Sequence, residues 1–341
     1  MRTLIIGASS LTGSCLCRLL DEQGEDYLGV VLPEELDSEA APRRTALDIL
    51  QSADVLSLLA DYRPDRVFDF AEQSSVREAW NDPGYTVNVN INGTIRVLEA
   101  AREACPQATI CLLGAGEEYG RVPFSRFPVS EEEPSRPLNL YAATKSCQTM
   151  LTQVYHRAYG MRVVTARAFN IIGPGQADKF AVSDFCRQTV RIRQGRQKAY
   201  FVGNLNIRRD FVDVRDLVRA SLLLSQLGRG GEVYNVGSGR AVSLLEILTL
   251  LREITGVEAD VSVRNDRIRH SDIPKTEADI SKITRDTGWS PKIPLRQSVL
   301  DMLQYWQQKE EQKSLFLSML QQLILLELKQ HCLELWQESM Y

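Results

Sequence analysis

Residues 2–23 have the sequence RTLIIGASSLTGSCLCRLLDEQ. The apolar run from Arg2 to Ile6 predicts a buried strand, and Leu11 to Gln23 has the length and the apolar spacing of a helix. The turn between them contains Gly7 and Gly13. In such turns a dinucleotide pyrophosphate approaches the backbone and meets the N-terminus of the helix. The segment therefore predicts a nucleotide-binding strand–turn–helix unit.

The turn lacks one glycine of the GxxGxxG pattern, because Ser10 stands at the middle position. Its Cβ narrows the approach to the backbone, and its hydroxyl is able to donate to a phosphate. An acidic residue about 20 positions later binds the adenosine ribose in such sites. Glu34 and Glu35 lie there and favour NAD, whereas the arginines at 43–44 would attract the 2′-phosphate of NADP. The cofactor is thus NAD or NADP, with NAD slightly favoured, and Asp48 is a candidate for the adenine contact.

Strand-like and helix-like segments alternate through the first half of the chain. This alternation predicts an α/β fold, a doubly wound Rossmann-like parallel sheet with helices on both faces. After Gly173 the pattern loosens and predicts a smaller α/β substrate-binding domain, with the ligand at the carboxyl ends of the strands. The expected strands are 2–6, 27–32, 67–70, 109–113, 161–168 and 208–214, and the expected helices are 11–23, 53–62, 86–104, 140–159, 244–255 and a polar stretch to about 206.

We expect three parts in the chain. The Rossmann domain takes 1–170 and 207–240, the substrate-binding domain takes 171–206 and 241–307, and a helical tail takes 308–341. The tail is expected either to dock on its own subunit or to join subunits. Its apolar residues at helical spacing are Phe316, Leu320, Leu323, Leu326 and Leu333, and Ser318, Gln321 and Gln322 interrupt the run and argue against membrane insertion.

The composition argues against several classes of protein. The chain has 341 residues, of which 44% are hydrophobic and 25% charged, as is ordinary for a globular protein. Its net charge of −4 argues against nucleic-acid binding, since proteins that bind the phosphate backbone are usually basic. Seven cysteines without a CxxC pair and only three histidines predict reduced thiols, a cytoplasmic location and no metal site. No stretch resembles a signal peptide or a membrane span, so no membrane partner is expected.

Tyr141 and Lys145 are four residues apart near the start of the helix expected at 140–159, and therefore share a face. A Tyr-x-x-x-Lys pair suits carbonyl reduction. The ammonium is expected to lower the pKa of the phenol, which then donates a proton to the carbonyl oxygen while hydride reaches the carbon. The alternative for the pair alone is a surface tyrosine stacked on a lysine stem.

The motifs around this pair resemble those of the extended short-chain dehydrogenase/reductases that act on nucleotide sugars, over roughly residues 1–307. They are the turn at 7–13, NINGT at 90–94, EEYG at 117–120, Tyr141-x-x-x-Lys145, RAFN at 167–170 with GPGQ at 173–176, and RDFVDV at 209–214. Within that group, the chain is most similar to the GDP-4-keto-6-deoxy-D-mannose reductases, near relatives of the GDP-mannose 4,6-dehydratases. The stretches that carry this likeness are FAEQSSV at 70–76, GAGEEYG at 114–120, VGNL at 202–205 and RHSDIP at 269–274.

The resemblance implies a role for each matching residue. Tyr141 would be the acid, and Lys145 would tune it and hold the nicotinamide ribose. Glu117 matches the glutamate that takes the C5 proton in dehydratases, although reductases also have a glutamate there. The cofactor would contact Gly7, Ser10, Leu11, Gly13, Glu34, Asp48, Ile49, Ala71, Asn90 and Lys145. The sugar nucleotide would contact Ser74, Asn170, Lys179, Arg209, Arg269 and Asp272, with the two arginines on the diphosphate and Asp272 on the nucleoside ribose.

Three positions depart from the family pattern. Ser10 replaces the middle glycine of the turn. Ala115 stands where the family has a serine or threonine, whose hydroxyl would share the carbonyl hydrogen bond with Tyr141, and Gly116 beside it also lacks a side chain. Glu72 lies beside the expected nicotinamide path, where the family has a small residue.

The resemblance implies an NAD(P)-dependent enzyme that reduces the 4-keto group of a GDP-4-keto-6-deoxy-hexose, slowly because of Ala115. Two alternatives stay open: a dehydratase or epimerase that keeps and recycles its NAD, and a non-catalytic member that binds the sugar nucleotide or the cofactor. Relatives commonly pair through the helices expected here at 86–104 and 140–159, so a homodimer is expected. Its apolar seam would use Ala100, Ala101, Ala104, Met150, Leu151 and Val154.

Overall fold

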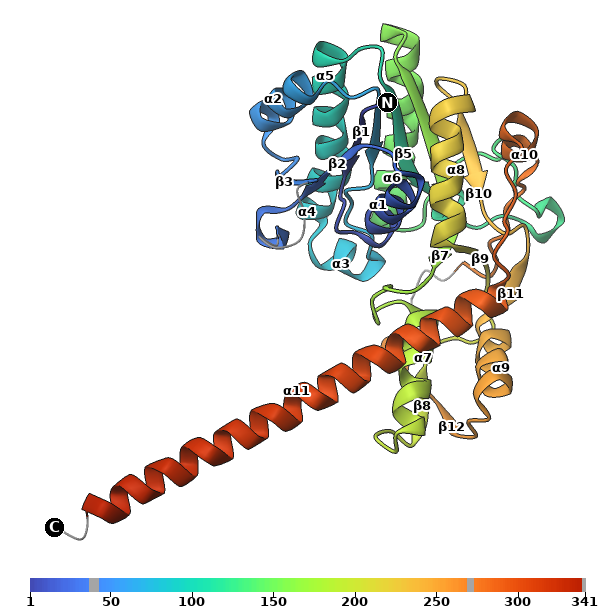
Figure 1. Cartoon of the computed structure of the whole chain (residues 1–341). Coiled ribbons are helices and arrows are strands. Elements are labelled where there is room, and N and C mark those ends of the chain that lie inside the picture. The colour runs from blue at the N-terminus through green and yellow to red at the C-terminus, as the bar shows by residue number, and fades with distance from the viewer. Residues whose placement is uncertain (37–42, 269–272, 339–341) are drawn as a thin grey trace.

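A computed structural model describes residues 1–36, 43–268 and 273–338, and for 317–338 it describes the backbone alone. Within these residues a parallel sheet has the strand order β10-β6-β5-β4-β1-β2-β3 (Figure 1). The order reverses between β1 and β4, which confirms the predicted doubly wound Rossmann-like fold. The strands are β1 (Thr3–Ile6), β2 (Tyr27–Val31), β3 (Arg44–Ala46), β4 (Arg66–Asp69), β5 (Thr109–Ala115), β6 (Arg162–Ala168) and β10 (Val233–Val236).

Helices cover both faces of this sheet. Successive strand residues point to opposite faces, so each central strand contributes to two apolar cores. In β1, Ile5 packs under α1 and α8, whereas Leu4 and Ile6 pack under α2 and α5. Because both faces are buried, the strands are continuous apolar runs. The covering helices are α1 (Leu11–Gln23), α2 (Ser52–Tyr62), α5 (Thr94–Ala104), α6 (Leu140–Tyr159) and α8 (Val214–Leu227).

The helix expected at 86–104 is not one regular helix. The short helices α3 (Val76–Asn81) and α4 (Pro83–Val87) come first, and a π-helical turn, Asn88–Gly93, leads into α5. Gly93 packs closely on Ile49, since a Cβ on this glycine would lie 2.5 Å from Ile49 Cδ1. The prediction is therefore wrong at this turn, where the chain uses a wider winding of a kind that is frequent at functional sites.

A second apolar core lies under α7 (Ala181–Arg193), α9 (Leu244–Thr255) and the start of α11 (Leu295–Glu338). The stretch expected to be helical to about 206 is helical only to Arg193. Ala199–Val202 form β8, because buried Tyr200 and Val202 alternate with more exposed neighbours. The other strands are β7 (Asn170–Ile172), β9 (Arg208–Asp213) and β11 (Ala241–Ser243), which form one small sheet, and β12 (Asp260–Val263), which pairs with β8.

The predicted division into domains differs from the packing at one place. Residues 241–307 were assigned to the substrate-binding domain, but α10 (Ser281–Thr287) packs on the core of the large sheet. Ile283 of this helix and Trp289 just after it are buried in that core. Hydrophobic packing thus brings the chain back to the Rossmann domain late in the sequence.

The C-terminal helix α11 extends far beyond the body of the molecule (Figure 1). Its first turns pack on α7, and Glu310 forms an ion pair with Arg187 (3.1 Å between Oε1 and Nε). By Phe316 the side chain is 65% exposed. The helical tail is confirmed: its start docks on its own subunit through Glu310 and Ser314, and the rest of the described helix runs away from the body. In the part of the chain that the structure describes, no helix combines the length and apolar character needed to cross a membrane.

The expected dimer seam is only partly available on the surface. Ala100 and Ala101 of α5 are buried in the core beneath α2 and α5, so they cannot meet a partner. Met150 and Val154 of α6 are exposed. The side chains of α5 that point into the core were thus wrongly assigned to the seam, because a 3.6-residue pattern alone does not say which apolar face packs inside.

Candidate active site

An open cavity of about 200 Å³ lies at the carboxyl ends of β1, β4, β5 and β6. It brings together residues that are far apart in the sequence and that are expected to serve in catalysis, cofactor binding and substrate binding. The expected site residues that line it are Ser10, Leu11, Ser74, Ala115, Glu117, Tyr141 and Asn170. Glu72, Gln176, Phe180 and Thr276 also line it, so both lobes contribute to the site.

The turn after β1 is closed too tightly for side chains. Gly7 has a φ of +79°, and a Cβ there would lie 2.8 Å from Ala71 N. A Cβ on Gly13 would lie 2.1 Å from Gly7 O. Ser10 Oγ accepts a hydrogen bond from Gly13 N (3.0 Å) and so caps α1. This bare backbone at a helix N-terminus fits the pyrophosphate of a dinucleotide.

The loop after β2 places a carboxylate against this turn. Glu35 Oε2 accepts hydrogen bonds from Ser9 Oγ (2.5 Å) and from Leu32 N (3.3 Å). Glu34, which the sequence favoured for the ribose, is exposed. Arg43 donates to Asp21 (3.1 Å), at the far end of α1. Glu35 thus lies beside the turn, where an adenosine ribose would bind, and the choice between NAD and NADP stays a prediction.

Two further expected cofactor contacts lie nearby. Asp48 follows β3, and its Oδ1 accepts a hydrogen bond from Leu50 N (2.9 Å). Ile49 is buried against Gly93. Their side chains therefore shape this part of the chain, and their contact with a cofactor stays a prediction.

Asn90 holds the loop that follows β4. Its side chain is fully buried, its Oδ1 accepts from Gln73 N (2.8 Å), and its Nδ2 donates to Gln73 O (3.1 Å) and Thr144 Oγ1 (3.0 Å). Each end of the amide therefore contacts the protein itself. Asn90 was expected to bind the cofactor, and in this structure it fixes the loop at 71–75 against α6 instead.

The start of α6 positions Tyr141 and Lys145. Asn139 caps the helix by accepting a hydrogen bond from Ala142 N (2.8 Å), which places Tyr141 in the first turn and Lys145 one turn later. Tyr141 lines the cavity and is 9% exposed, whereas Lys145 lies below it and is 1% exposed. Lys145 Nζ donates to Leu113 O (2.7 Å) and forms an ion pair with the Glu72 carboxylate. The pair is buried, which rules out the surface-stacking alternative.

The surroundings of Tyr141 oppose the expected lowering of its pKa. Burial raises the pKa of Tyr141 well above its ordinary value, and the charges of Glu72, Glu117 and Glu118 raise it further. The Lys145 ammonium lies 5.9 Å from the centroid of the Tyr141 ring, and Glu72 neutralises it. The sequence showed the lysine, but the fold decides how many carboxylates surround the phenol.

Ala115 is the last residue of β5 and packs beside Tyr141. A neighbouring hydroxyl, from Thr144 or Ser74, could replace the missing one. Thr144 is 1% exposed and already donates to Tyr141 O (2.8 Å). Ser74 lines the cavity and stays a candidate. Glu117 also lines the cavity, and its Oε2 accepts from Asn139 Nδ2 (3.0 Å), so the helix cap holds this carboxylate.

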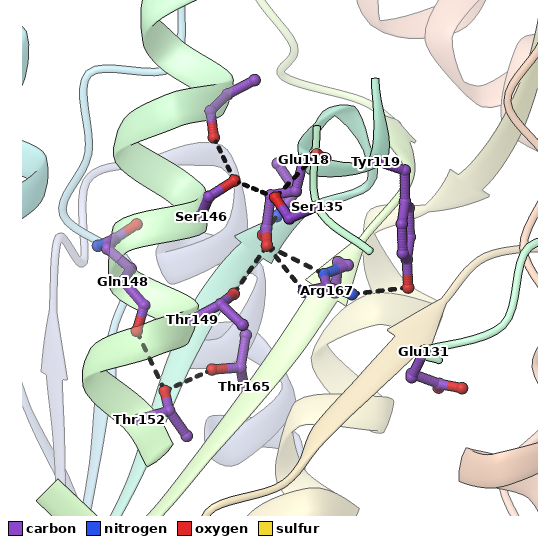
Figure 2. Close-up of polar contacts among 12 residues, drawn as sticks. Glu118, Tyr119, Glu131, Ser135, Ser146, Gln148, Thr149, Thr152, Thr165 and Arg167 are labelled. Carbon is purple, nitrogen blue, oxygen red and sulfur yellow. Dashed lines mark hydrogen bonds and ion pairs between the residues drawn. The ribbon is translucent and has the colours of Figure 1, made fainter. Parts of the chain in front are cut away.

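A buried polar network supports the wall of the cavity from behind (Figure 2). Figure 2 shows Glu118 between Arg167 of β6 and Thr149 of α6. Its Oε1 accepts from Ala115 N (2.9 Å), and its Oε2 accepts from Arg167 Nη2 (2.8 Å) and Thr149 Oγ1 (2.8 Å). Arg167 also donates to Tyr119 Oη (2.6 Å). Glu118 thereby fixes the end of β5 relative to α6, a role that sequence reasoning missed because the adjacent Glu117 and Glu118 carry no signal of which one points inward.

The expected substrate contacts are less tightly grouped. Asn170 Oδ1 accepts from Thr276 Oγ1 (3.4 Å) at the cavity, and exposed Lys179 lies 5.6 Å from the ring centroid of Phe180, which lines it. Arg209, at the start of β9, donates to Ile273 O (2.6 Å). Arg269 and Asp272 lie outside the described residues. Binding of a diphosphate by the two arginines thus stays a prediction.

Comparison with known proteins shows the family of the chain. The family model for GDP-mannose 4,6 dehydratase matches residues 4–302. The chain belongs to this family. One relative is the GDP-6-deoxy-D-mannose reductase of Pseudomonas aeruginosa. It is 35% identical to this chain over 247 residues, which cover 72% of this chain and 81% of that protein.

Solved structures give the same picture of the family fold. RMD from Pseudomonas aeruginosa, solved with NADPH, is 31% identical, with a TM-score of 0.80 over 90% of this chain and 99% of that one. The UDP-glucose 4-epimerase of Thermus thermophilus, solved with NAD, is 25% identical, with a TM-score of 0.80 over 90% of this chain and 98% of that one. Relatives thus include a reductase and an epimerase, and their cofactors include both NADPH and NAD.

Proposed function

We propose that the chain reduces the 4-keto group of a GDP-4-keto-6-deoxy-hexose, with NAD(P)H as the reductant. The observation that carries this proposal is the environment of Tyr141. Burial and three carboxylates raise its pKa, so the phenol keeps its proton at neutral pH. A reductase needs this form, because it must donate a proton to the ketone oxygen. The likeness to the Pseudomonas aeruginosa reductase supports the same reaction.

Different residues of the cavity would bind the cofactor, donate the proton and contact the sugar nucleotide. The turn at Gly7 and Gly13 would hold the cofactor pyrophosphate, and Glu35 the adenosine ribose. When bound, the reduced nicotinamide would supply hydride to the sugar C4. Tyr141 donates its proton to O4 of the sugar, and Ser74 lines the same cavity. Phe180 and Thr276 close the cavity from the second lobe, where the sugar nucleotide would enter.

A dehydratase or epimerase reaction is the second candidate, because Glu117 lines the cavity and the family model is that of a dehydratase. These reactions begin with oxidation at C4, so Tyr141 would first have to accept a proton. The surrounding carboxylates oppose the phenolate that this requires. The reductase reaction is therefore our conclusion.

The cofactor and the assembly follow from neighbouring features. Glu35 beside the turn favours NAD over NADP, because its charge opposes a 2′-phosphate. The exposed Met150 and Val154 of α6 support a homodimer through this helix. A cytoplasmic location is also part of the proposal and rests on the composition.

The test is a single-turnover assay with a GDP-4-keto-6-deoxy-hexose and either reduced cofactor. We expect stoichiometric oxidation of NADH or NADPH by the unmodified chain and none by Tyr141→Phe. Full activity of Tyr141→Phe would refute the proposal. If no variant turns over although calorimetry shows that the GDP-sugar binds, the chain is a non-catalytic member of the family.

A further inference from the structure

Glu72 is the carboxylate that departs from the family pattern beside the expected nicotinamide path. It lies in the loop after β4, lines the cavity, and its side chain is only 14% exposed. A buried carboxylate is costly unless a partner compensates for its lost hydration. Its partner is Lys145, which is itself buried.

The ion pair decides where the lysine ammonium lies. Lys145 Nζ contacts the Glu72 carboxylate on one side and donates to Leu113 O (2.7 Å) on the other. Leu113 belongs to β5 and Glu72 to the loop after β4, so the ammonium is held between neighbouring strands of the sheet. The loop that carries Glu72 is itself fixed, because Asn90 binds both Gln73 N and Gln73 O.

The charges that face Tyr141 come from each element packed around it. Glu72 faces it from the loop after β4, Glu117 and Glu118 from the turn after β5, and Lys145 from its own helix. Behind Lys145, burial raises the pKa of Asp69 to about 6, while the ammonium opposes this rise. Lys145 is therefore surrounded by more negative charge than it carries positive charge.

We propose that Glu72 is a positioning residue, which holds the Lys145 ammonium against β5 and sets Tyr141 up as a proton donor rather than a proton acceptor. This role rests on the proposed reductase function and deepens it. With Glu72 in place, the positive charge that would stabilise a phenolate is already paired. Without it, the ammonium is free to stabilise the phenolate, and Tyr141 becomes a better base and a poorer acid.

The direct test measures ionisation of Tyr141 without substrate or cofactor. The phenolate absorbance of each protein is titrated, and the spectrum of the same protein carrying Tyr141→Phe is subtracted, which removes the other tyrosines. We expect Glu72→Gln to form the Tyr141 phenolate at lower pH than the unmodified chain. Glu72→Asp keeps the charge and should stay close to the unmodified chain. Glu78→Gln is the matched control, because Glu78 is exposed on α3 nearby.

The two proteins are compared at the highest pH where circular dichroism shows both to be folded. Equal Tyr141 phenolate signals in Glu72→Gln and the unmodified chain would overturn the proposal. If Glu72→Gln does not fold, Glu72→Ala is compared in the same way, since it removes both the charge and the polar group. A second readout is the pH profile of single-turnover reduction, whose alkaline limb should move to lower pH in Glu72→Gln. An unchanged profile in an active, folded variant would also overturn it. A shifted titration in a chain that reduces no sugar would refute the proposed function and leave the role of Glu72 standing.

Discussion

Replacing Ala115 with serine should raise the rate of reduction. Ala115 ends β5, is 7% exposed and packs beside Tyr141 in the cavity wall. Its backbone N–H is held by Glu118 Oε1 (2.9 Å), so the position of the new side chain is fixed by the buried network behind it. The added hydroxyl would be attached to the carbon that is the methyl group of Ala115. It would give the ketone oxygen a second hydrogen-bond donor.

The size of the gain follows from the charge that develops on that oxygen. As the 4-keto group is reduced, negative charge grows on O4, and Tyr141 is one donor to it. A second donor of this kind contributes about 2.7–4 kcal/mol to the transition state. We therefore expect Ala115→Ser to accelerate single-turnover oxidation of the reduced cofactor by roughly a hundred- to a thousand-fold.

The control is the double variant Ala115→Ser with Tyr141→Phe, which should be as inactive as Tyr141→Phe alone. Circular dichroism and the thermal midpoint establish that each variant is folded. An unchanged rate in a folded Ala115→Ser chain that binds its substrate would refute the reasoning, and would indicate that Ser74 already supplies the second donor.

Four other outcomes are expected. Arg209→Ala should weaken GDP binding by about 1.5–3 kcal/mol in calorimetry, the range for hydrogen bonds to a charged group, and equal affinity would remove it from the diphosphate site. Burial raises the pKa of Asp69 from 3.8 to about 6, so its contribution to stability is present below about pH 4 and is lost as pH rises through about 6. Urea unfolding at several pH values should show that Asp69→Asn removes this pH-dependent loss, which totals about 3 kcal/mol. Glu118→Gln should lower the free energy of unfolding by about 3–5 kcal/mol, because it leaves a buried arginine unpaired, whereas exposed Glu132→Gln should not. A chain ending at Phe316 should keep its fold, and light scattering then shows whether the removed helix holds subunits together.

The sequence predicted the nucleotide-binding unit accurately because its signals are local. α1 and α6 begin and end where their caps and apolar spacing indicated, and the turn at Gly7 follows from the backbone shape that only glycine adopts easily. β8 was missed because a short strand with two buried positions looks like part of a polar helix. Short segments of this kind are decided by tertiary packing rather than by local pattern.

The residues of the site were predicted by type and place but not by environment. Tyr141 and Ala115 line the cavity as expected. The surroundings of the phenol were not predicted, because they depend on side chains from two separate loops and a helix, which meet only in the folded chain. Asn90 shows the same limit, since a buried amide can bind a ligand or fix a loop, and its hydrogen-bond partners alone distinguish the two.

The projecting helix α11 changes how the molecule moves through water. From residue 317 to the end of the described helix it rises by roughly 33 Å, at about 1.5 Å per residue. A rod of that length adds friction out of proportion to its mass, so the 38.4 kDa chain would sediment more slowly and elute earlier from a sizing column than a sphere of equal mass. An apparent mass from elution alone would thus resemble that of a larger assembly, and only a shape-independent mass distinguishes an elongated monomer from a compact dimer.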